Sequence, residues 1–196
     1  MNLGGTLVGV LAALACGYAQ AGAQKYEPLA ASVQAALHTA VADLAAPEPQ
    51  FASEEEKQAW LAAMSQRLAA YMPDRVARQE FLKTVYYEAK RAGLDPQLVL
   101  GVIHVESRFR KYAVSVAGAR GYMQVMPFWI GLIGQRQNNL FHLRLNLRYG
   151  CTILRHYLDL EHGDLYRALG RYNGSLGQAE YPNLVRAAWN GKWAWR

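Results

Sequence analysis

Apolar residues recur at helical spacing along most of the chain, and several of these stretches open at a recognisable helix start. Ser53 with Glu56 three residues later is a capping box, which satisfies free backbone N–H groups of the first turn. Asp95 followed by Pro96 is a second start signal, because the acid caps N–H groups and proline fits the first helical position. The predicted helices span 53–73, 74–93, 96–107, 147–163 and a shorter stretch from 164. No alternating run is long enough for a strand, so we predict a mainly α fold.

The first 23 residues are typical of an export signal. The apolar run over 7–16, "LVGVLAALAC", has the length of a signal-peptide core and is short for a membrane span. Small residues in "AQA" and "AGA" then offer cleavage points up to Ala23, but no Lys or Arg precedes the run, so an uncleaved anchor or a misassigned start stays open. Pro47 and Pro49 mark a linker. We expect a signal peptide over 1–23, a short helical extension over 24–73, a principal domain over 74–196, and a location in the periplasm or cell envelope.

The charge balance favours an anionic partner. The chain has 21 Lys plus Arg against 15 Asp plus Glu, a formal net charge of +6. This charge suits nucleic acid, anionic lipid or a carboxylate-bearing polymer. The net charge alone does not distinguish these three kinds of partner. The apparent leader and the absence of a basic recognition-helix pattern argue against nucleic acid.

One acid, Glu106, lies at the end of an otherwise apolar helix face. Val99, Val102 and Ile103 precede it by seven, four and three residues, so all four residues share one face. Burial and the helix C-terminus both raise the pKa of a carboxyl group there, whereas the arginines that follow would lower it if they came close. A carboxylic acid that stays protonated near neutral pH can act as a general acid. The alternative is a glutamate that only caps the helix or pairs with a neighbouring arginine.

Four stretches occur in the order and spacing of a known family: "VIHVESRF", "SVAGARGYMQVMP", "NLRYGCTILRHYL" and "ALGRYNGS". Together they resemble the catalytic domain of soluble lytic transglycosylases, and the match covers roughly 81–189. The resemblance implies a lysozyme-like helical fold of the goose type, with 74–196 as the catalytic domain. It implies neither a metal nor another cofactor.

The same resemblance implies a reaction. The family cleaves the β-1,4 bond between N-acetylmuramic acid and N-acetylglucosamine in peptidoglycan without water and leaves a 1,6-anhydro end. Glu106 would protonate the glycosidic oxygen and then accept a proton from the C6 hydroxyl. The acid-free run over 107–158 agrees with a single catalytic carboxylate, although Asp159 or Glu180 could fold back toward the site.

Further site residues are implied by position. Ser115 matches a serine that contacts the N-acetyl group of the sugar, and is otherwise an ordinary loop residue. Gln124 and Met126 match residues that hold the glycan by a hydrogen bond and an apolar contact, with core packing as the alternative for Met126.

The "YN" pair and one departure complete the expected site. Tyr172 matches a tyrosine whose hydroxyl lies near the catalytic glutamate and assists proton transfer, with a core tyrosine whose hydroxyl is satisfied as the alternative. Asn173, which follows it, is expected to bind substrate. Tyr122 stands where the family most often has leucine, so it either offers a stacking surface to the substrate or packs in the core. The three tryptophans within 189–195 either contact substrate or, the reading we favour, seal the domain.

The expected partner is the glycan strand of peptidoglycan, bound by a monomer, with a further partner in the cell-envelope machinery left open. Two other functions compete. One is an inactive peptidoglycan-binding or secretion-machine scaffold, against which an intact Glu106 and Tyr172 argue. The other is a hydrolytic muramidase, which would need a carboxylate to activate water.

Overall fold

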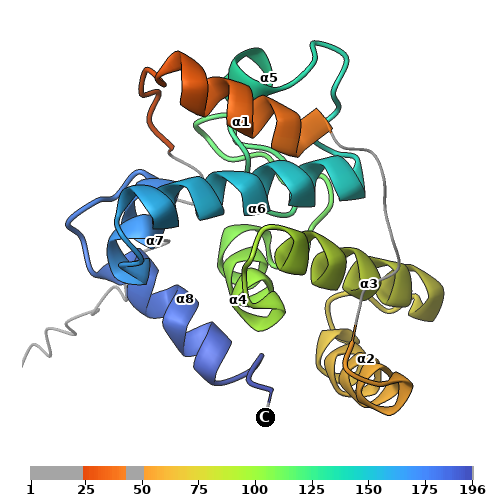
Figure 1. Ribbon diagram of the computed structural model, residues 1–196. Helices are drawn as coiled ribbons and strands as arrows, with labels where there is room; N and C mark the ends of the chain where they lie inside the picture. Colours follow the sequence, from red (N-terminus) through yellow and green to blue (C-terminus); the bar gives the residue numbers. More distant parts are fainter. Residues whose placement is uncertain (1–23, 43–50, 196) are drawn as a thin grey trace, which may run out of the picture.

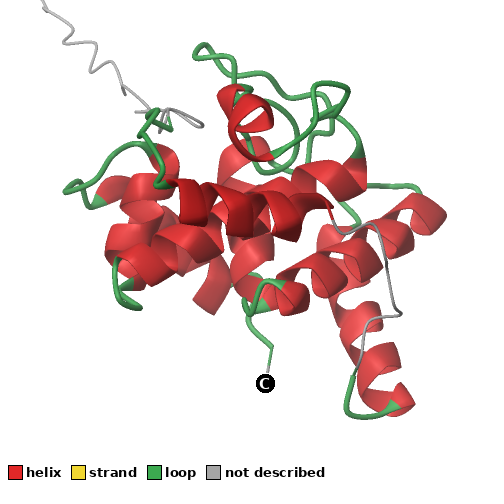
Figure 2. Ribbon diagram, turned by 45° about the horizontal axis from the view of Figure 1, so that its top comes forward, coloured by secondary structure: helices red, strands yellow, loops and turns green. Residues whose placement is uncertain are grey.

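The computed structural model describes residues 24–42 and 51–195, so the expected export signal and the Pro47–Pro49 linker lie outside the described residues. Within these ranges the chain forms helices and two isolated β-bridges but no strand (Figure 2). The helices are α1 (Ala31–Ala42), α2 (Glu54–Leu68), α3 (Arg75–Arg91), α4 (Pro96–Ser107), α5 (Phe128–Ile133), α6 (Leu143–Leu160), α7 (Leu165–Asn173) and α8 (Glu180–Asn190). The prediction of a mainly α fold is confirmed.

Local capping explains where the helices near the site begin. The Ser53 hydroxyl accepts from the Glu56 N–H at 3.1 Å, and the Glu56 carboxylate accepts from the N–H of Ala52 at 3.0 Å. Asp74 caps α3 in the same way, and Asp95 Oδ1 accepts from the Gln97 N–H at 2.8 Å. These starts agree with the sequence prediction because each depends on residues within one turn.

Helix α6 runs across the middle of the molecule, with α1 and α5 on one side and α3 and α4 on the other (Figure 1). A buried ion pair joins α6 to α3: Arg148 donates to Glu88 from Nη2 at 2.8 Å and from Nε at 3.1 Å. Both side chains are almost fully buried. The extension contributes α1, which packs on α5 and α6, and α2, which packs on α3. None of the helices in the described ranges is long and apolar enough to span a bilayer.

Two helices, α5 and α8, were not predicted from the sequence. Helix α8 packs along α4 so closely that a Cβ on Gly101 would lie 3.2 Å from the backbone of Val185 and of Trp189. Beyond α8, Trp193 is fully buried and packs on Phe109 with ring centroids 5.0 Å apart. The C-terminal aromatic residues therefore lie along α4: Trp189 donates to Asp95 at the start of this helix, and Trp193 donates to His104 in its last turn.

Candidate active site

Glu106 lies in the last turn of α4 and is 4% exposed. The helix ends directly after it, because Arg108 and Phe109 both adopt left-handed backbone conformations, with φ of 50° and 62°. Arg108 and Arg110 are exposed, whereas Glu106 is buried against the core. The prediction that this acid lies on the buried face of its helix is thus what the structure shows.

The hydroxyl of Tyr181, in the first turn of α8, donates to Glu106 Oε1 at 2.7 Å. Burial raises the pKa of Tyr181 well above its ordinary value, and the negative charge of Glu106 raises it further. Tyr181 therefore keeps its proton throughout the physiological range and serves as a permanent donor to the carboxyl group. Tyr181 was not predicted from the sequence. The helical spacing of Tyr181 and Val185, both buried, was the available signal.

Tyr172 is fully buried in α7, and its hydroxyl donates to the backbone oxygen of Met123 at 2.7 Å. Burial raises the pKa of Tyr172 well above its ordinary value, the charge of Glu106 raises it further, and the Gln24 amide acts in the opposite direction. Tyr172 therefore lies within electrostatic reach of Glu106 and ties α7 to the loop that carries Met123. The hydroxyl that bonds directly to Glu106 is that of Tyr181.

The loop over 113–127 carries Ser115, Gln124 and Met126 of the expected glycan-binding residues, together with Tyr122. Ser115 is half-buried, and its hydroxyl accepts from the Ala119 N–H at 3.1 Å, which closes a turn. Gln124 is 2% exposed and donates from Nε2 to the backbone oxygens of Gly121 at 2.9 Å and Ala113 at 3.1 Å. The Gln124 amide therefore folds the loop. Met126 is half-buried at the end of this loop.

Comparison of the sequence with known protein families identifies the family of this chain. The family described as Transglycosylase SLT domain matches residues 83–188, more than half of the chain. The chain belongs to the transglycosylase SLT domain family. The lysozyme-like helical class expected from the resemblance is therefore the class of this SLT domain, and the matched range contains every residue that we assigned to the site.

Relatives of the SLT domain carry names of the same kind. Membrane-bound lytic murein transglycosylase C of Actinobacillus pleuropneumoniae serotype 5b (strain L20) is 50% identical over 52 residues, which cover 26% of this chain and 14% of the relative. The transglycosylase of Enterobacteria phage PRD1 is 33% identical over 102 residues, covering 52% and 37%. Membrane-bound lytic murein transglycosylase C of Histophilus somni (strain 2336) is 43% identical over 97 residues, covering 43% and 27%. The chain thus spans well under half the length of these relatives, and no solved structure matches it.

Two expected residues of the SLT domain are buried. Tyr122 is 6% exposed, its ring lies 4.9 Å from that of Phe81, and burial raises its pKa to about 12. This position corresponds to the core-packing alternative rather than to a stacking surface. Asn173 is the last residue of α7 and is 5% exposed.

Asn146 of α6, which was not predicted from the sequence, holds the site loop in place. Its Oδ1 accepts from the Met123 N–H at 2.8 Å, and its Nδ2 donates to the backbone oxygens of Arg120 and Leu140, each at 2.8 Å. A Cβ on Gly121 would lie 2.4 Å from this Nδ2, so glycine is required at the point of contact. Asn146 lies in the stretch "NLRYG", which carried part of the family resemblance.

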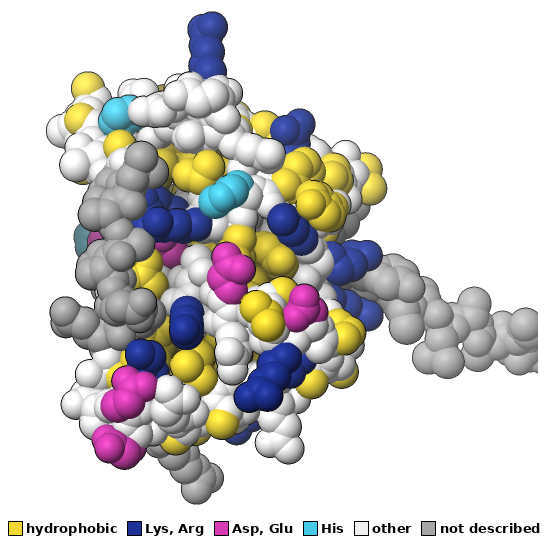
Figure 3. Space-filling model, turned by 90° about the vertical axis from the view of Figure 1, so that its right-hand side faces the viewer, with side chains coloured by type: hydrophobic (Ala, Val, Ile, Leu, Met, Phe, Trp, Pro, Cys, Tyr) yellow, Lys and Arg dark blue, Asp and Glu magenta, His cyan; other side chains and the backbone are white. Residues whose placement is uncertain are grey.

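The positive charge of the SLT domain is partly used in internal ion pairs. Arg148 is buried against Glu88, and Arg155 pairs with Asp159. On the face drawn in Figure 3, Lys and Arg side chains are spread among acidic and apolar ones rather than gathered into one patch. This distribution offers no continuous basic surface on that face.

Proposed function

We propose that this chain is a peptidoglycan lytic transglycosylase that cleaves the β-1,4 bond between N-acetylmuramic acid and N-acetylglucosamine and leaves a 1,6-anhydro end. The observation that carries the proposal is the buried carboxyl group of Glu106, held by the Tyr181 hydroxyl at 2.7 Å, within a transglycosylase SLT domain. The names of the relatives support the same activity.

In the proposed reaction, protonated Glu106 gives its proton to the glycosidic oxygen, and the bond from that oxygen to C1 of the muramic residue breaks. The resulting carboxylate then takes the proton of the C6 hydroxyl as O6 bonds to C1. The proton is thus returned to Glu106 and no water is consumed. Tyr181 donates to Oε1 of Glu106 throughout the reaction. This hydrogen bond is strongest while Glu106 is ionised, because hydrogen bonds to charged groups are stronger than those between neutral groups.

The placement of the other acids supports a single catalytic carboxylate. Asp159 is exposed at the end of α6 and pairs with Arg155, and Glu180 is exposed at the start of α8. Neither shares the buried environment of Glu106, whereas a hydrolytic mechanism of the inverting type needs a second carboxylate that faces the acid across the substrate. A hydrolytic muramidase is therefore the less supported function.

The deciding experiment is mass analysis of glycan fragments released from purified peptidoglycan. A transglycosylase gives a product lighter by one water than the hydrolytic product. Glu106→Gln should lower the rate by about 10² to 10⁴, because the amide cannot donate and then accept the proton. Hydrated ends in the products, or near-normal activity of a folded Glu106→Gln protein, would each contradict the proposal.

We further propose a location in the cell envelope, with action as a monomer on glycan strands. The words "membrane-bound" and "murein" in the names of the relatives support the envelope location. Fractionation of cells, followed by size-exclusion chromatography of the purified chain, tests both statements.

A further inference from the structure

Three contacts fasten the segment over 24–30, which precedes α1, to the residues around the proposed site. The side chain of Gln24 is inserted into the protein and the residue is 4% exposed. The rings of Tyr26 and Phe128 meet in a T-shaped arrangement, with centroids 5.7 Å apart. Glu27 pairs with Arg171 of α7 at 3.2 Å. Tyr26 and Glu27 are themselves exposed, whereas Gln24 is buried and Leu29 packs, partly buried, against the core.

The side-chain amide of Gln24 lies at a position where two N–H groups donate hydrogen bonds to its oxygen. Gln24 Oε1 accepts from the indole N–H of Trp129 at 3.0 Å and from the backbone N–H of Met126 at 3.4 Å. Gln24 Nε2 is buried and makes no hydrogen bond of good geometry with the described residues, although the Gln24 amide is close enough to the Tyr172 hydroxyl to lower the pKa of that group. A buried donor without a partner is costly, so this place suits a carbonyl group better than it suits a whole carboxamide.

An N-acetyl group has the features that this place favours. It carries a carbonyl oxygen for the two N–H donors and a methyl group in the position where the carboxamide carries its unpaired NH₂. The place also adjoins the loop of the proposed site: Met126 lies at the end of that loop, and Met123 of the same loop accepts from the Tyr172 hydroxyl at 2.7 Å. Met126, whose N–H is used, is one of the residues expected to hold the glycan.

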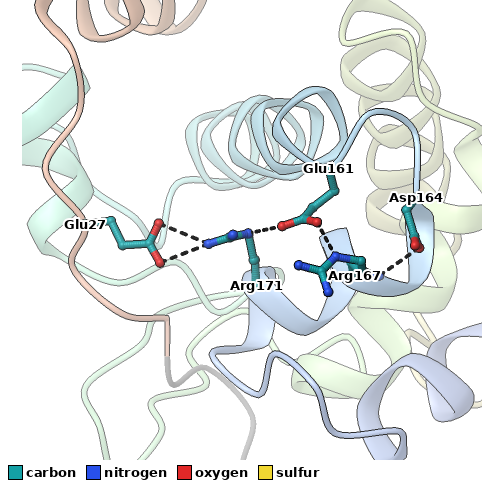
Figure 4. A network of polar contacts seen from close by, with 5 residues as sticks. All are labelled: Glu27, Glu161, Asp164, Arg167 and Arg171. Carbon is teal, nitrogen blue, oxygen red and sulfur yellow. Dashed lines mark hydrogen bonds and ion pairs between the residues drawn. The ribbon is translucent and has the colours of Figure 1, made fainter.

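The ion pair that fastens the segment is held in place from α7. Arg171 lies between Glu27 and Glu161, and Glu161 also accepts from Arg167, which contacts Asp164 through its backbone N–H (Figure 4). Arg171 is thus oriented by Glu161 and presents Nη1 to the carboxylate of Glu27. The Glu27 side chain is 47% exposed, and exposed ion pairs are weak and are screened by salt, so this contact can open.

We propose that residues 24–30 form a releasable strap, in which the Gln24 carboxamide stands in for the N-acetyl group of a sugar and must leave before the glycan binds there. The strap is autoinhibitory: substrate competes with Gln24 for the N–H groups of Trp129 and Met126. This inference rests on the proposed function for the identity of the ligand, an N-acetylated glycan.

The test measures binding without turnover. Glu106→Gln in the full chain serves as the parent protein, and the probe is a chitooligosaccharide, which carries an N-acetyl group on every sugar. Gln24→Ala removes the stand-in, and Glu27→Gln weakens the fastening. If the strap is closed in about nine of ten molecules, each change should tighten binding by up to about tenfold, because apparent affinity is reduced by the fraction of competent protein.

Two controls isolate the strap. Glu55→Gln makes the same charge change on the exposed face of α2 and should leave binding unchanged. A cello-oligosaccharide, which lacks N-acetyl groups, should gain nothing from either strap variant. In an NMR titration of the parent, the Trp129 indole N–H signal should shift with the chitooligosaccharide, and the amides over 24–30 should become more mobile.

The strap proposal would be wrong if Gln24→Ala and Glu27→Gln bound the chitooligosaccharide equally or more weakly than the parent, or if none of the proteins bound it. Gln24 would then be a fixed part of the protein core at this position. The proposed function is judged separately, by the products that the protein with Glu106 intact releases from peptidoglycan. Cleavage to anhydro ends with unchanged oligosaccharide binding would overturn the strap alone, and tighter binding with no cleavage would overturn the function alone.

Discussion

Tyr181 and Glu106 are 75 residues apart in sequence, and the tyrosine hydroxyl donates a hydrogen bond of 2.7 Å to the carboxyl oxygen Oε1 of Glu106. The contact depends on the packing of α8 along α4, which brings the first turn of one helix to the last turn of the other. The pKa of Tyr181 is raised well above its ordinary value by burial and by Glu106, so the donor is present over the whole working range of pH.

Tyr181→Phe should therefore lower kcat while leaving the fold intact. The ring still packs, but Glu106 loses a donor, and hydrogen bonds to charged groups contribute about 1.5 to 3 kcal/mol, which corresponds to roughly 10- to 100-fold in rate. Steady-state kinetics on purified peptidoglycan measure the effect, which we expect in kcat rather than in KM. Tyr166→Phe, which removes a hydroxyl bonded to the Ala179 backbone at 3.2 Å, is the matched control and should have normal kinetics. A Tyr181→Phe protein as active as the parent would remove Tyr181 from the mechanism.

Tyr172→Phe should cost stability as well as activity. Loss of the hydroxyl leaves the buried backbone oxygen of Met123 without this donor, at a cost of about 1 to 3 kcal/mol in the free energy of unfolding. The site loop that Met123 belongs to should loosen, so kcat should fall less than in Glu106→Gln. Urea unfolding and kinetics on the same samples check both effects. Unchanged stability would show that the hydrogen bond contributes nothing net.

Glu88→Gln should be among the most destabilising single changes in the chain. It leaves Arg148 charged and buried without its carboxylate, and breaking a buried pair from one side costs about 3 to 5 kcal/mol. Asp159→Asn breaks the exposed pair with Arg155 and should cost less than about 1 kcal/mol, which makes it the matched control. Chemical denaturation of both variants measures the difference. Similar losses in the two proteins would contradict this account of α3 and α6.

Acidification should destabilise the domain through His104. Burial lowers the pKa of His104 below 6.5, and the charges of Lys192 and Arg108 lower it further. The unfolded chain then binds more protons than the folded one, so this contribution to stability is present above about pH 6.5 and is lost as the pH falls through the pKa of the folded state. Protonation also removes the acceptor for Trp193, whose Nε1 donates to His104 Nδ1 at 3.0 Å.

The measurement is the free energy of unfolding across this pH range. His104→Gln should flatten its fall on the acid side, whereas His38→Gln, on the exposed face of α1, should keep the parent slope. A parent-like slope in His104→Gln would assign the pH dependence to other groups, of which His156, whose pKa is also lowered chiefly by burial, is the first to examine.

How much was predictable follows from the range of each interaction. The start of α4 and the buried position of Glu106 depend on residues within a few turns, and the sequence indicated both. Tyr181 was missed because α8 has no side-chain cap at Ala179 and its contact with Glu106 is tertiary. The role of Gln124 could not be predicted for a different reason. A side-chain amide can bond to a sugar or to the protein backbone equally well, and in the structure Gln124 bonds to the backbone of its own loop.

The order of the chain gives the packing of α8 on α4 a consequence for biosynthesis. A ribosome completes α4, with Glu106, well before it reaches Tyr181 and Trp193, and a nascent or truncated chain without α8 has neither the donor to the acid nor the aromatic seal over α4. Under the proposed function, the catalytic acid would therefore gain its hydrogen-bond donor only after α8 has been made and has packed on α4. We expect truncation before α8 to leave a protein that still carries Glu106 but lacks the hydroxyl that bonds to it.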